Sequence, residues 1–307
     1  MKNQIALIGL GVIGIPIAHK LSAAYGKHFC LIASGERKQR LKQKKMYIND
    51  EIFSPQIISD RSEIDNDIDL LIVCIKNYDL EISLCDIRRV ISDGTVILPL
   101  QNGITSYEFF RSEFPKNIVL QGYVQGPNTI KNGSVMSYRN AGIMHIGNPI
   151  DLEKDYASYV YNLLIYAGVN VYLENNIRKM VWKKWMLNIA GNSITALTGA
   201  DYNQFKKYGD LIDLCRKSMY EFLKIAAVEK IDLSKQDVED IINYYVSYKG
   251  KKQTSMLVDV MNRRKTENEY LAGALLKIAN KHKISLPITN VLYSLIKIKE
   301  EIYLDED

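Results

Sequence analysis

Residues 4–14 read Gln-Ile-Ala-Leu-Ile-Gly-Leu-Gly-Val-Ile-Gly, an apolar stretch followed at once by three glycines with the spacing G-x-G-x-x-G. The stretch 4–8 is typical of a buried strand, and 12–24 is predicted to form a helix. In such a turn Gly9 permits the tight bend, Gly11 lets backbone N–H groups approach a pyrophosphate, and Gly14 lets the helix pack closely on the strand. The helix dipole favours the phosphates as well. The segment therefore predicts dinucleotide binding, with contacts at Gly9, Leu10, Gly11, Val12, Ile13 and Gly14.

The rest of the first half alternates between strand-like and helical patterns. Strands are predicted at 28–33, 69–75 and 95–98, and helices from residue 36, at 80–91 and at 106–114. The segment 69–75 is apolar almost throughout, which is typical of a strand covered on both faces. This order favours a parallel sheet with right-handed crossovers. Short strand-like pieces separated by glycines follow at 118–147, and then a helix at 152–167 and a brief strand at 169–173.

After Asn175 the pattern is almost wholly helical to the end of the chain. We therefore predict an α/β protein, with a Rossmann-type doubly wound parallel sheet at its N-terminal end and an all-helical C-terminal domain. The dinucleotide-binding domain is predicted to span 1–174, and the helical domain, which would bind substrate and carry catalysis, 175–307.

Composition excludes several classes of protein. Hydrophobic residues make up 47% of the 307 residues and charged residues 24%, which is the balance of a globular chain and not of a disordered one. The net charge of +5 is small, and the densest run of cations, at 37–45, is interpreted as a solvated helix face, so no nucleic-acid partner is expected. No apolar stretch reaches the ~18 residues of a membrane span.

Cysteine usage and the N-terminal segment favour a cytoplasmic protein. The four cysteines are widely spaced and form no C-x-x-C pair, so no metal site is predicted and a reducing compartment fits. The apolar run at 5–18 is interrupted by three glycines and is followed by no clear cleavage site, so it is not interpreted as a signal peptide.

The end of the second predicted strand bears on the choice of cofactor. Enzymes that use NAD usually place a carboxylate there for the ribose 2′-hydroxyl, whereas those that use NADP prefer basic or small polar residues. Here Ser34 stands at the tip and Arg37 and Lys38 follow closely, which favours NADPH, while Glu36 argues against it.

A helix predicted within 175–199 carries polar residues in an apolar setting. Lys184, Asn188 and Asn192 are spaced i, i+4, i+8 and fall on one helical stripe. One interpretation is a polar ladder satisfied within the core. The other is chemical: a partly desolvated lysine can protonate the alkoxide that forms when hydride reaches a carbonyl carbon.

Five motifs together resemble the ketopantoate reductase (2-dehydropantoate 2-reductase) family. They are GLGVIG at 9–14, IVCIK ending at Lys76, LQNG with Asn102, the WKKWMLNIAGNSITAL helix, and TSMLVD at 254–259 followed by Lys265-Thr266-Glu267. Their order and the twelve-residue spacing from Ser255 to Glu267 match the family, and the likeness extends over most of the chain.

The resemblance implies an NADPH-dependent reductase that converts 2-dehydropantoate to pantoate in pantothenate and coenzyme A biosynthesis. Lys184 would be the general acid, and Glu267 would orient the substrate hydroxyl or the lysine. Asn188, Asn192 and Ser255 would bind the substrate, and Lys76 and Asn102 would line the cofactor–substrate cleft. Ser34 and Arg37 would lie at the cofactor's ribose. A homodimer is compatible with the apolar C-terminal helices.

The chain departs from the family pattern where Ser34 replaces a common arginine and Ser193 a common proline, and Asn77-Tyr78 has no close match. The alternatives are a reductase of another small 2-oxo acid, an opine-type dehydrogenase, or a non-catalytic NADP-sensing protein. An opine enzyme would need a His–Asp pair that the sequence does not offer, and a sensor would need neither Lys184 nor Glu267.

Overall fold

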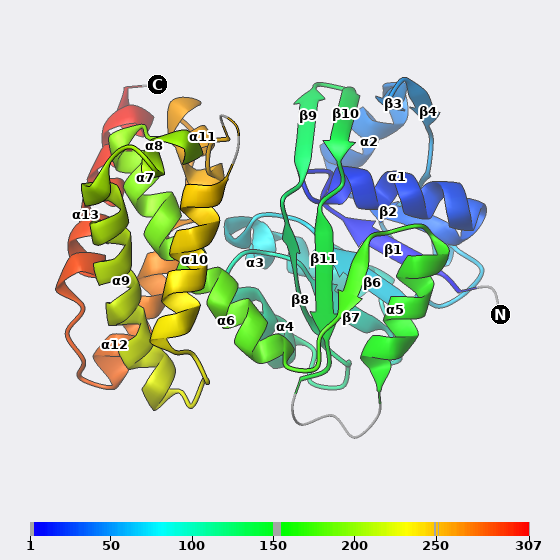
Figure 1. Ribbon diagram of the computed structural model, residues 1–307. Coiled ribbons are helices and arrows are strands. Elements are labelled where there is room, and N and C mark those ends of the chain that lie inside the picture. The colour runs from blue at the N-terminus through cyan, green and yellow to red at the C-terminus, as the bar shows by residue number, and fades with distance from the viewer. Residues whose placement is uncertain (1–2, 150–154, 249, 251, 307) are drawn as a thin grey trace. The chain divides into compact units, whose positions relative to one another are not determined.

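The computed structural model describes residues 3–149, 155–248, 250 and 252–306 (Figure 1). The chain divides into two compact units, Met1–Arg178 and Lys179–Asp307. The division falls at 178/179, inside a helix that begins at Ile177, whereas the sequence pattern placed it at 174/175, just before that helix. Each unit is described below by itself.

Unit 1 is built on a five-stranded parallel sheet of order β5-β2-β1-β6-β7. Its strands are β1 (Ile5–Ile8), β2 (Phe29–Ile32), β5 (Gln56–Ile58), β6 (Leu70–Val73) and β7 (Val96–Pro99). The chain runs outward from β1 in one direction to β2 and in the other to β6. The point between β1 and β6 is therefore the topological switch point, where such sheets bind ligands. The predicted Rossmann-type parallel sheet is confirmed.

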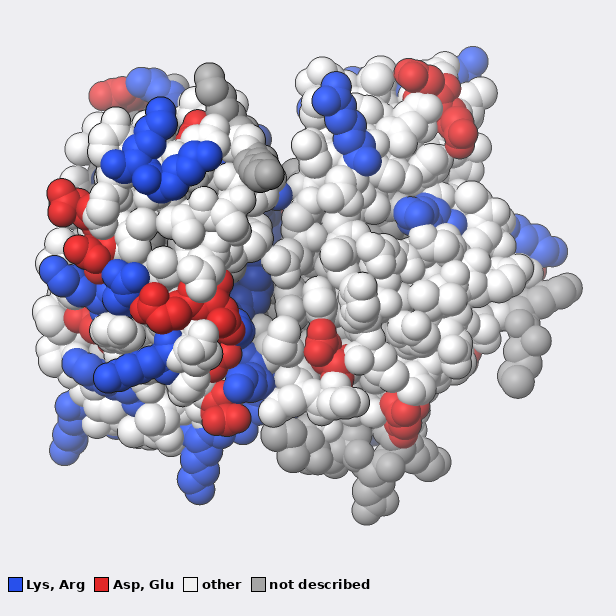
Figure 2. All heavy atoms as spheres, in the orientation of Figure 1, with Lys and Arg blue, Asp and Glu red and all other residues white. Residues whose placement is uncertain are grey.

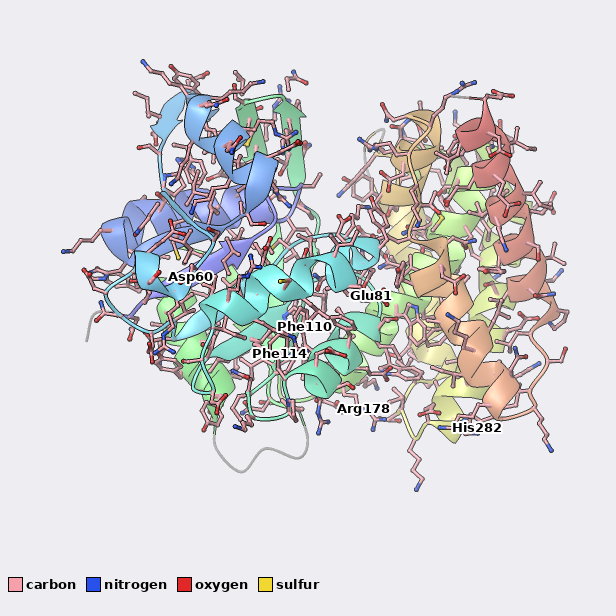
Figure 3. All side chains as sticks on the ribbon, turned by 180° about the vertical axis from the view of Figure 1, so that it is seen from behind. Asp60, Glu81, Phe110, Phe114, Arg178 and His282 are labelled. Carbon is pink, nitrogen blue, oxygen red and sulfur yellow. The ribbon has the colours of Figure 1, made fainter. Side chains whose placement is uncertain are left out.

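Helices cover both faces of this sheet, as the apolar strand patterns predicted. Alternate residues of β1 belong to different cores: Ile5 and Leu7 pack with one set of helices and Ala6 and Ile8 with the other. The first set is α1 (Gly14–Tyr25) and α5 (Tyr156–Tyr166), and the second is α3 (Leu80–Val90) and α4 (Thr105–Glu113). Figure 3 shows Phe110 of α4, and Phe114 directly after that helix, on this second face; their ring centroids are 6.0 Å apart. The remaining helix, α2 (Gly35–Gln43), follows β2.

Two smaller sheets complete unit 1, with strand orders β4-β3-β10-β9 and β12-β11-β8. Their strands are β3 (Met46–Ile48), β4 (Glu51–Phe53), β8 (Gln121–Gln125), β9 (Asn128–Asn132), β10 (Val135–Asn140), β11 (Ile143–Gly147) and β12 (Val171–Leu173). The glycine-punctuated strands at 118–147 were predicted, but β3, β4 and β5 were not. Each of these three is only three residues long, too short for a periodic pattern to show.

The described residues of unit 2 form helices joined by loops, with no strand among them. Its α-helices are α6 (Ile177–Leu187), α7 (Ser193–Thr198), α8 (Tyr202–Phe205), α9 (Gly209–Val228), α10 (Lys235–Ser247), α11 (Ser255–Met261), α12 (Ala274–Lys281) and α13 (Pro287–Asp305). Two π-helices, η4 (Asn188–Asn192) and η5 (Glu269–Gly273), lie next to each other. The helix expected within 175–199 is thus not one regular α-helix but α6, η4 and α7 in succession.

The surface of unit 2 carries charges of both signs. Acidic and basic side chains adjoin one another over α9 and α10 (Figure 2), where the ion pairs include Arg216–Glu239 and Lys183–Asp240. Across the described residues, no helix is both long and apolar enough to pass through a membrane. The same residues contain no group of three or more histidine, cysteine or carboxylate side chains arranged to hold a metal ion.

Candidate active site

The glycine loop lies at the switch point of the sheet, between β1 and α1. Gly9 has a φ of +104°, and a Cβ there would lie 2.6 Å from the backbone of Cys74 and Ile75. A Cβ on Gly14 would lie 1.9 Å from the Gly9 carbonyl oxygen. These two glycines are therefore required by the protein's own packing. At Gly11 the nearest protein atom would be 3.8 Å away, an ordinary contact, so the protein itself leaves room for a side chain at this position.

That contrast fits a dinucleotide. Since none of the described residues demands a glycine at position 11, its bare backbone fits the close approach of a phosphate group. The loop residues Leu10, Val12 and Ile13 complete the turn into α1, whose N-terminal end opens at the same place. The residues present thus fit the pyrophosphate of a nicotinamide dinucleotide.

The hairpin of β9 and β10 folds back over this loop. The Lys131 ammonium donates a hydrogen bond to the Leu10 carbonyl at 2.9 Å, and the Thr129 hydroxyl donates to the Val12 carbonyl at 2.8 Å. Partial burial, followed by the nearby charges of Arg37 and Arg40, lowers the pKa of Lys131. Two cations of α2 therefore lie near Lys131 of the distant strand β9, which was not among the sequence candidates.

An acidic residue from a distant part of the chain lies at the tip of β2. The Ser34 hydroxyl donates a hydrogen bond to Asp86 of α3 at 2.9 Å. Partial burial lowers the pKa of Arg37, and Asp79 and Asp86 act in the opposite direction. Lys38, the other cation considered for a phosphate contact, is held by Glu63 at 2.6 Å and by Ser59 at 2.9 Å. This pairing leaves Arg37 as the phosphate candidate of the two.

The loops after β6 and β7 meet at the same edge of the sheet. The Asn77 side chain donates a hydrogen bond to the Asn102 carbonyl at 3.1 Å, which links the loop carrying Lys76 to the one carrying Asn102. Beside them, the side chain of Gln101 is buried, and neither of its amide atoms has a hydrogen-bond partner among the described residues. Since buried amides are normally paired, this side chain fits a place that a bound ligand completes.

The substrate candidates of unit 2 converge around η4. Asn188 and Asn192 are both buried in the π-helix, and the Asn192 amide lies 3.5 Å from the hydroxyl of Ser255, the first residue of α11. Glu267 is buried just before η5, which packs against η4. The structure therefore brings Asn192 and Ser255 together, although 63 residues separate them along the chain.

Lys184 and its neighbour Lys183 have opposite electrostatic surroundings. Burial, and to a lesser degree the positive charge of Lys252, lowers the pKa of Lys184 to about 8. Burial also acts to lower the pKa of Lys183, but hydrogen bonds to Asp240 at 2.8 Å and Asp237 at 2.9 Å raise it overall. Lys184 is thus the lysine of the pair whose proton is more easily released, which is what a general acid needs.

Sequence reasoning missed several residues that lie beside the candidates within one unit or the other: Asp86, Gln101 and Lys131 in unit 1, and Lys252 in unit 2. Asp86 and Lys131 are far away in the chain from Ser34 and Leu10, which they contact, so no local spacing signals them. Gln101 stands next to Asn102 in the LQNG motif, so its place in the sequence could have drawn attention to it.

Comparison with known proteins assigns both units to one family. The model of "Ketopantoate reductase PanE/ApbA" matches residues 5–150, and that of its C-terminal part matches residues 176–300. A 2-dehydropantoate 2-reductase of Escherichia coli O157:H7 is 26% identical over 239 residues, which cover 76% of this chain and 75% of that protein.

Solved structures agree over nearly the whole chain. D-mandelate dehydrogenase with NADH and anilino(oxo)acetate matches with a TM-score of 0.85 and 25% identity, covering 98% of this chain and 99% of that one. A dimeric ketopantoate reductase from Staphylococcus aureus matches with a TM-score of 0.81 and 22% identity, over the same shares of the two chains.

Proposed function

The chain belongs to the ketopantoate reductase family of oxidoreductases, and this membership supports a nicotinamide cofactor. We propose that the protein uses NADPH to reduce 2-dehydropantoate to pantoate in pantothenate synthesis. The observation that carries the proposal is Lys184, half-buried, with a pKa lowered to about 8, on the same helical segment as two buried asparagines. Unit 1 would bind the dinucleotide, and unit 2 would bind the oxo acid.

The proton step follows from the residues of unit 2. A bound nicotinamide would supply the hydride to the carbonyl carbon. The carbonyl oxygen then gains negative charge, and the Lys184 ammonium transfers a proton to it and becomes a neutral amine. Asn188 and Asn192 would bind the oxo acid with Ser255, and Glu267 would orient its hydroxyl or the lysine.

On the side of unit 1, Gly9 to Gly14 would hold the pyrophosphate, and Lys76 and Asn102 would lie along the nicotinamide half. The positive charges of Arg37, Arg40 and Lys131 support a 2′-phosphate ligand and hence NADPH. Ser34 would bind near the ribose.

A second candidate is the NADH-dependent reduction of a different small 2-oxo acid. It is favoured by Asp86, which stands beside Ser34 where NAD enzymes place a carboxylate, and by the likeness to D-mandelate dehydrogenase with NADH. The ratio of kcat/KM for 2-dehydropantoate to that for a 2-oxo acid with an aromatic substituent, each measured with both cofactors, separates the two candidates.

The test follows the absorbance of NADPH in the presence of 2-dehydropantoate. We expect Lys184→Ala to lower kcat by about 10²–10⁴, the usual effect of removing a positioned acid. Affinity for NADPH should be unchanged, since the glycine loop belongs to the other unit. Glu267→Ala should act mainly through KM for the oxo acid. Full turnover by Lys184→Ala would contradict the proposed chemistry.

A further inference from the structure

The segment that joins α6 to α7 departs from regular helical geometry at the candidate site. Residues Asn188–Asn192 form a π-helix, and all five are buried. A π turn widens the helix by one residue, so the ordinary bond from each N–H to the carbonyl four residues earlier is lost there. In an α-helix the Gly191 N–H would donate to the Leu187 carbonyl. Both groups are buried, so they need other partners.

Tyr245 of α10 supplies that partner. Its hydroxyl donates a hydrogen bond to the Leu187 carbonyl at 2.7 Å, and the Gly191 backbone hydrogen-bonds the same hydroxyl. One side-chain oxygen is therefore inserted between the two groups that an α-helix would join directly. A Cβ at Gly191 would lie 2.2 Å from this oxygen, so only glycine leaves room for it.

The tyrosine is held firmly in that place. Its side chain is fully buried, and its ring stacks on Phe205 with centroids 4.7 Å apart. The neighbouring π-helix η5 has a related arrangement, because the Trp185 indole N–H donates to the Leu271 carbonyl inside it at 3.3 Å. A buried aromatic side chain from another element thus donates to a backbone carbonyl within η5 and to the one just before η4.

We propose that Tyr245 is a positioning residue of this enzyme, whose hydroxyl keeps residues 188–192 in π-helical register and thereby sets the placement of Asn188 and Asn192 relative to Lys184. The inference rests on the function proposed above. Without the hydroxyl, the Leu187 carbonyl and the Gly191 N–H are free to form the α-helical bond. Removing one residue from the wide turn rotates the helix on one side of it by about 100° relative to the other.

The test compares Tyr245→Phe with Tyr202→Phe, which removes a hydroxyl from the same aromatic cluster; the two rings are 5.8 Å apart. We expect Tyr245→Phe to lower kcat/KM for the oxo acid by about 10- to 100-fold, as a misplacement of about 1 Å does, with KM for NADPH unchanged. Tyr202→Phe should keep kcat/KM close to that of the wild type. A Tyr245→Phe protein with a lower Tm but with the kcat/KM of the wild type would overturn the proposal.

Two further measurements do not depend on that variant's activity alone. Gly191→Ala should displace the Tyr245 side chain, since its Cβ would lie 2.2 Å from the hydroxyl oxygen and 2.8 Å from the ring carbon Cζ, and should therefore lower kcat/KM for the oxo acid. An unchanged kcat/KM in Gly191→Ala would contradict the proposal. A crystal structure of Tyr245→Phe should show α-helical bonds at 188–192, and a retained π-helix would overturn the inference. This last result is independent of whether the wild type reduces 2-dehydropantoate.

Discussion

At the scale of single residues, Lys184 connects a measurable pKa with the proposed proton transfer. Its pKa of about 8 is lower than that of an ordinary lysine because of burial and the charge of Lys252. The acid form is required for reduction, so we expect kcat/KM to be level below pH 8 and to fall about tenfold per pH unit above it. Lys252→Gln removes the neighbouring charge and should shift this fall to higher pH.

The matched control for that measurement is Lys224→Gln, on the exposed face of α9, which should leave the pH profile unchanged. A profile of kcat/KM that rises with pH through 8 would mean that the neutral amine is the active form, and Lys184 would then not be the acid.

A second residue-scale prediction concerns Asp86 and the choice of cofactor. Its carboxylate accepts a hydrogen bond from the Ser34 hydroxyl and would repel the 2′-phosphate of a bound NADPH. We expect Asp86→Asn to raise the ratio of kcat/KM for NADPH to that for NADH by about tenfold, the effect of one charged interaction. Lys131→Ala should lower the same ratio. Asp93→Asn, at the exposed amino-terminal side of β7, is the control, and a similar change in that variant would contradict the assignment.

At the scale of elements, Lys183 joins α6 to α10 through its bonds to Asp237 and Asp240. With these ion pairs present, we expect a normal kcat for Lys183→Ala but a loss of about 1–2 kcal/mol in the free energy of unfolding, because Asp237 is partly buried. Urea denaturation measures this, with the exposed Lys217→Ala as the reference. A normal unfolding free energy would show that the ion pairs contribute nothing.

At the scale of the whole molecule, α13, whose course Figure 1 shows, carries a stripe of exposed apolar side chains. Val291, Leu295, Ile298 and Ile302 are between 47% and 57% exposed, and their 4-3-4 spacing is that of a helix-pairing seam. We propose that two copies of the chain pair along this stripe about a two-fold axis, with Leu295 of one copy against Ile298 of the other.

Sedimentation measures this assembly directly. We expect a dimer for the wild type and a monomer for the double variant Leu295→Glu, Ile298→Glu, with Tm retained by the monomer. Ile130→Glu, on the exposed hairpin of unit 1, is the matched control and should remain dimeric. A wild type that sediments as a monomer, or a double variant that stays dimeric, would exclude pairing through α13.

The local parts of this protein follow from its sequence. The glycine spacing at 9–14 predicts the turn of the switch point because Gly9 has a positive φ and a Cβ on Gly14 would meet the Gly9 carbonyl oxygen. The apolar runs at 69–75 and 95–98 predict covered strands since burial on both faces needs continuous apolar residues. The family resemblance rests on the same short motifs. All of these depend on neighbours in sequence.

Contacts across long separations were decided only by tertiary structure. Asp86 reaches Ser34 across 52 residues, Lys131 reaches Leu10 across 121, and Tyr245 reaches Leu187 across 58. The π-helix at 188–192 could not be predicted from the sequence, because these residues fit an α-helix equally well and the inserted hydroxyl comes from α10. The physical reason is the same in each case: tertiary packing decides which partner a buried polar group bonds, and the local spacing of residues in the sequence does not determine that packing.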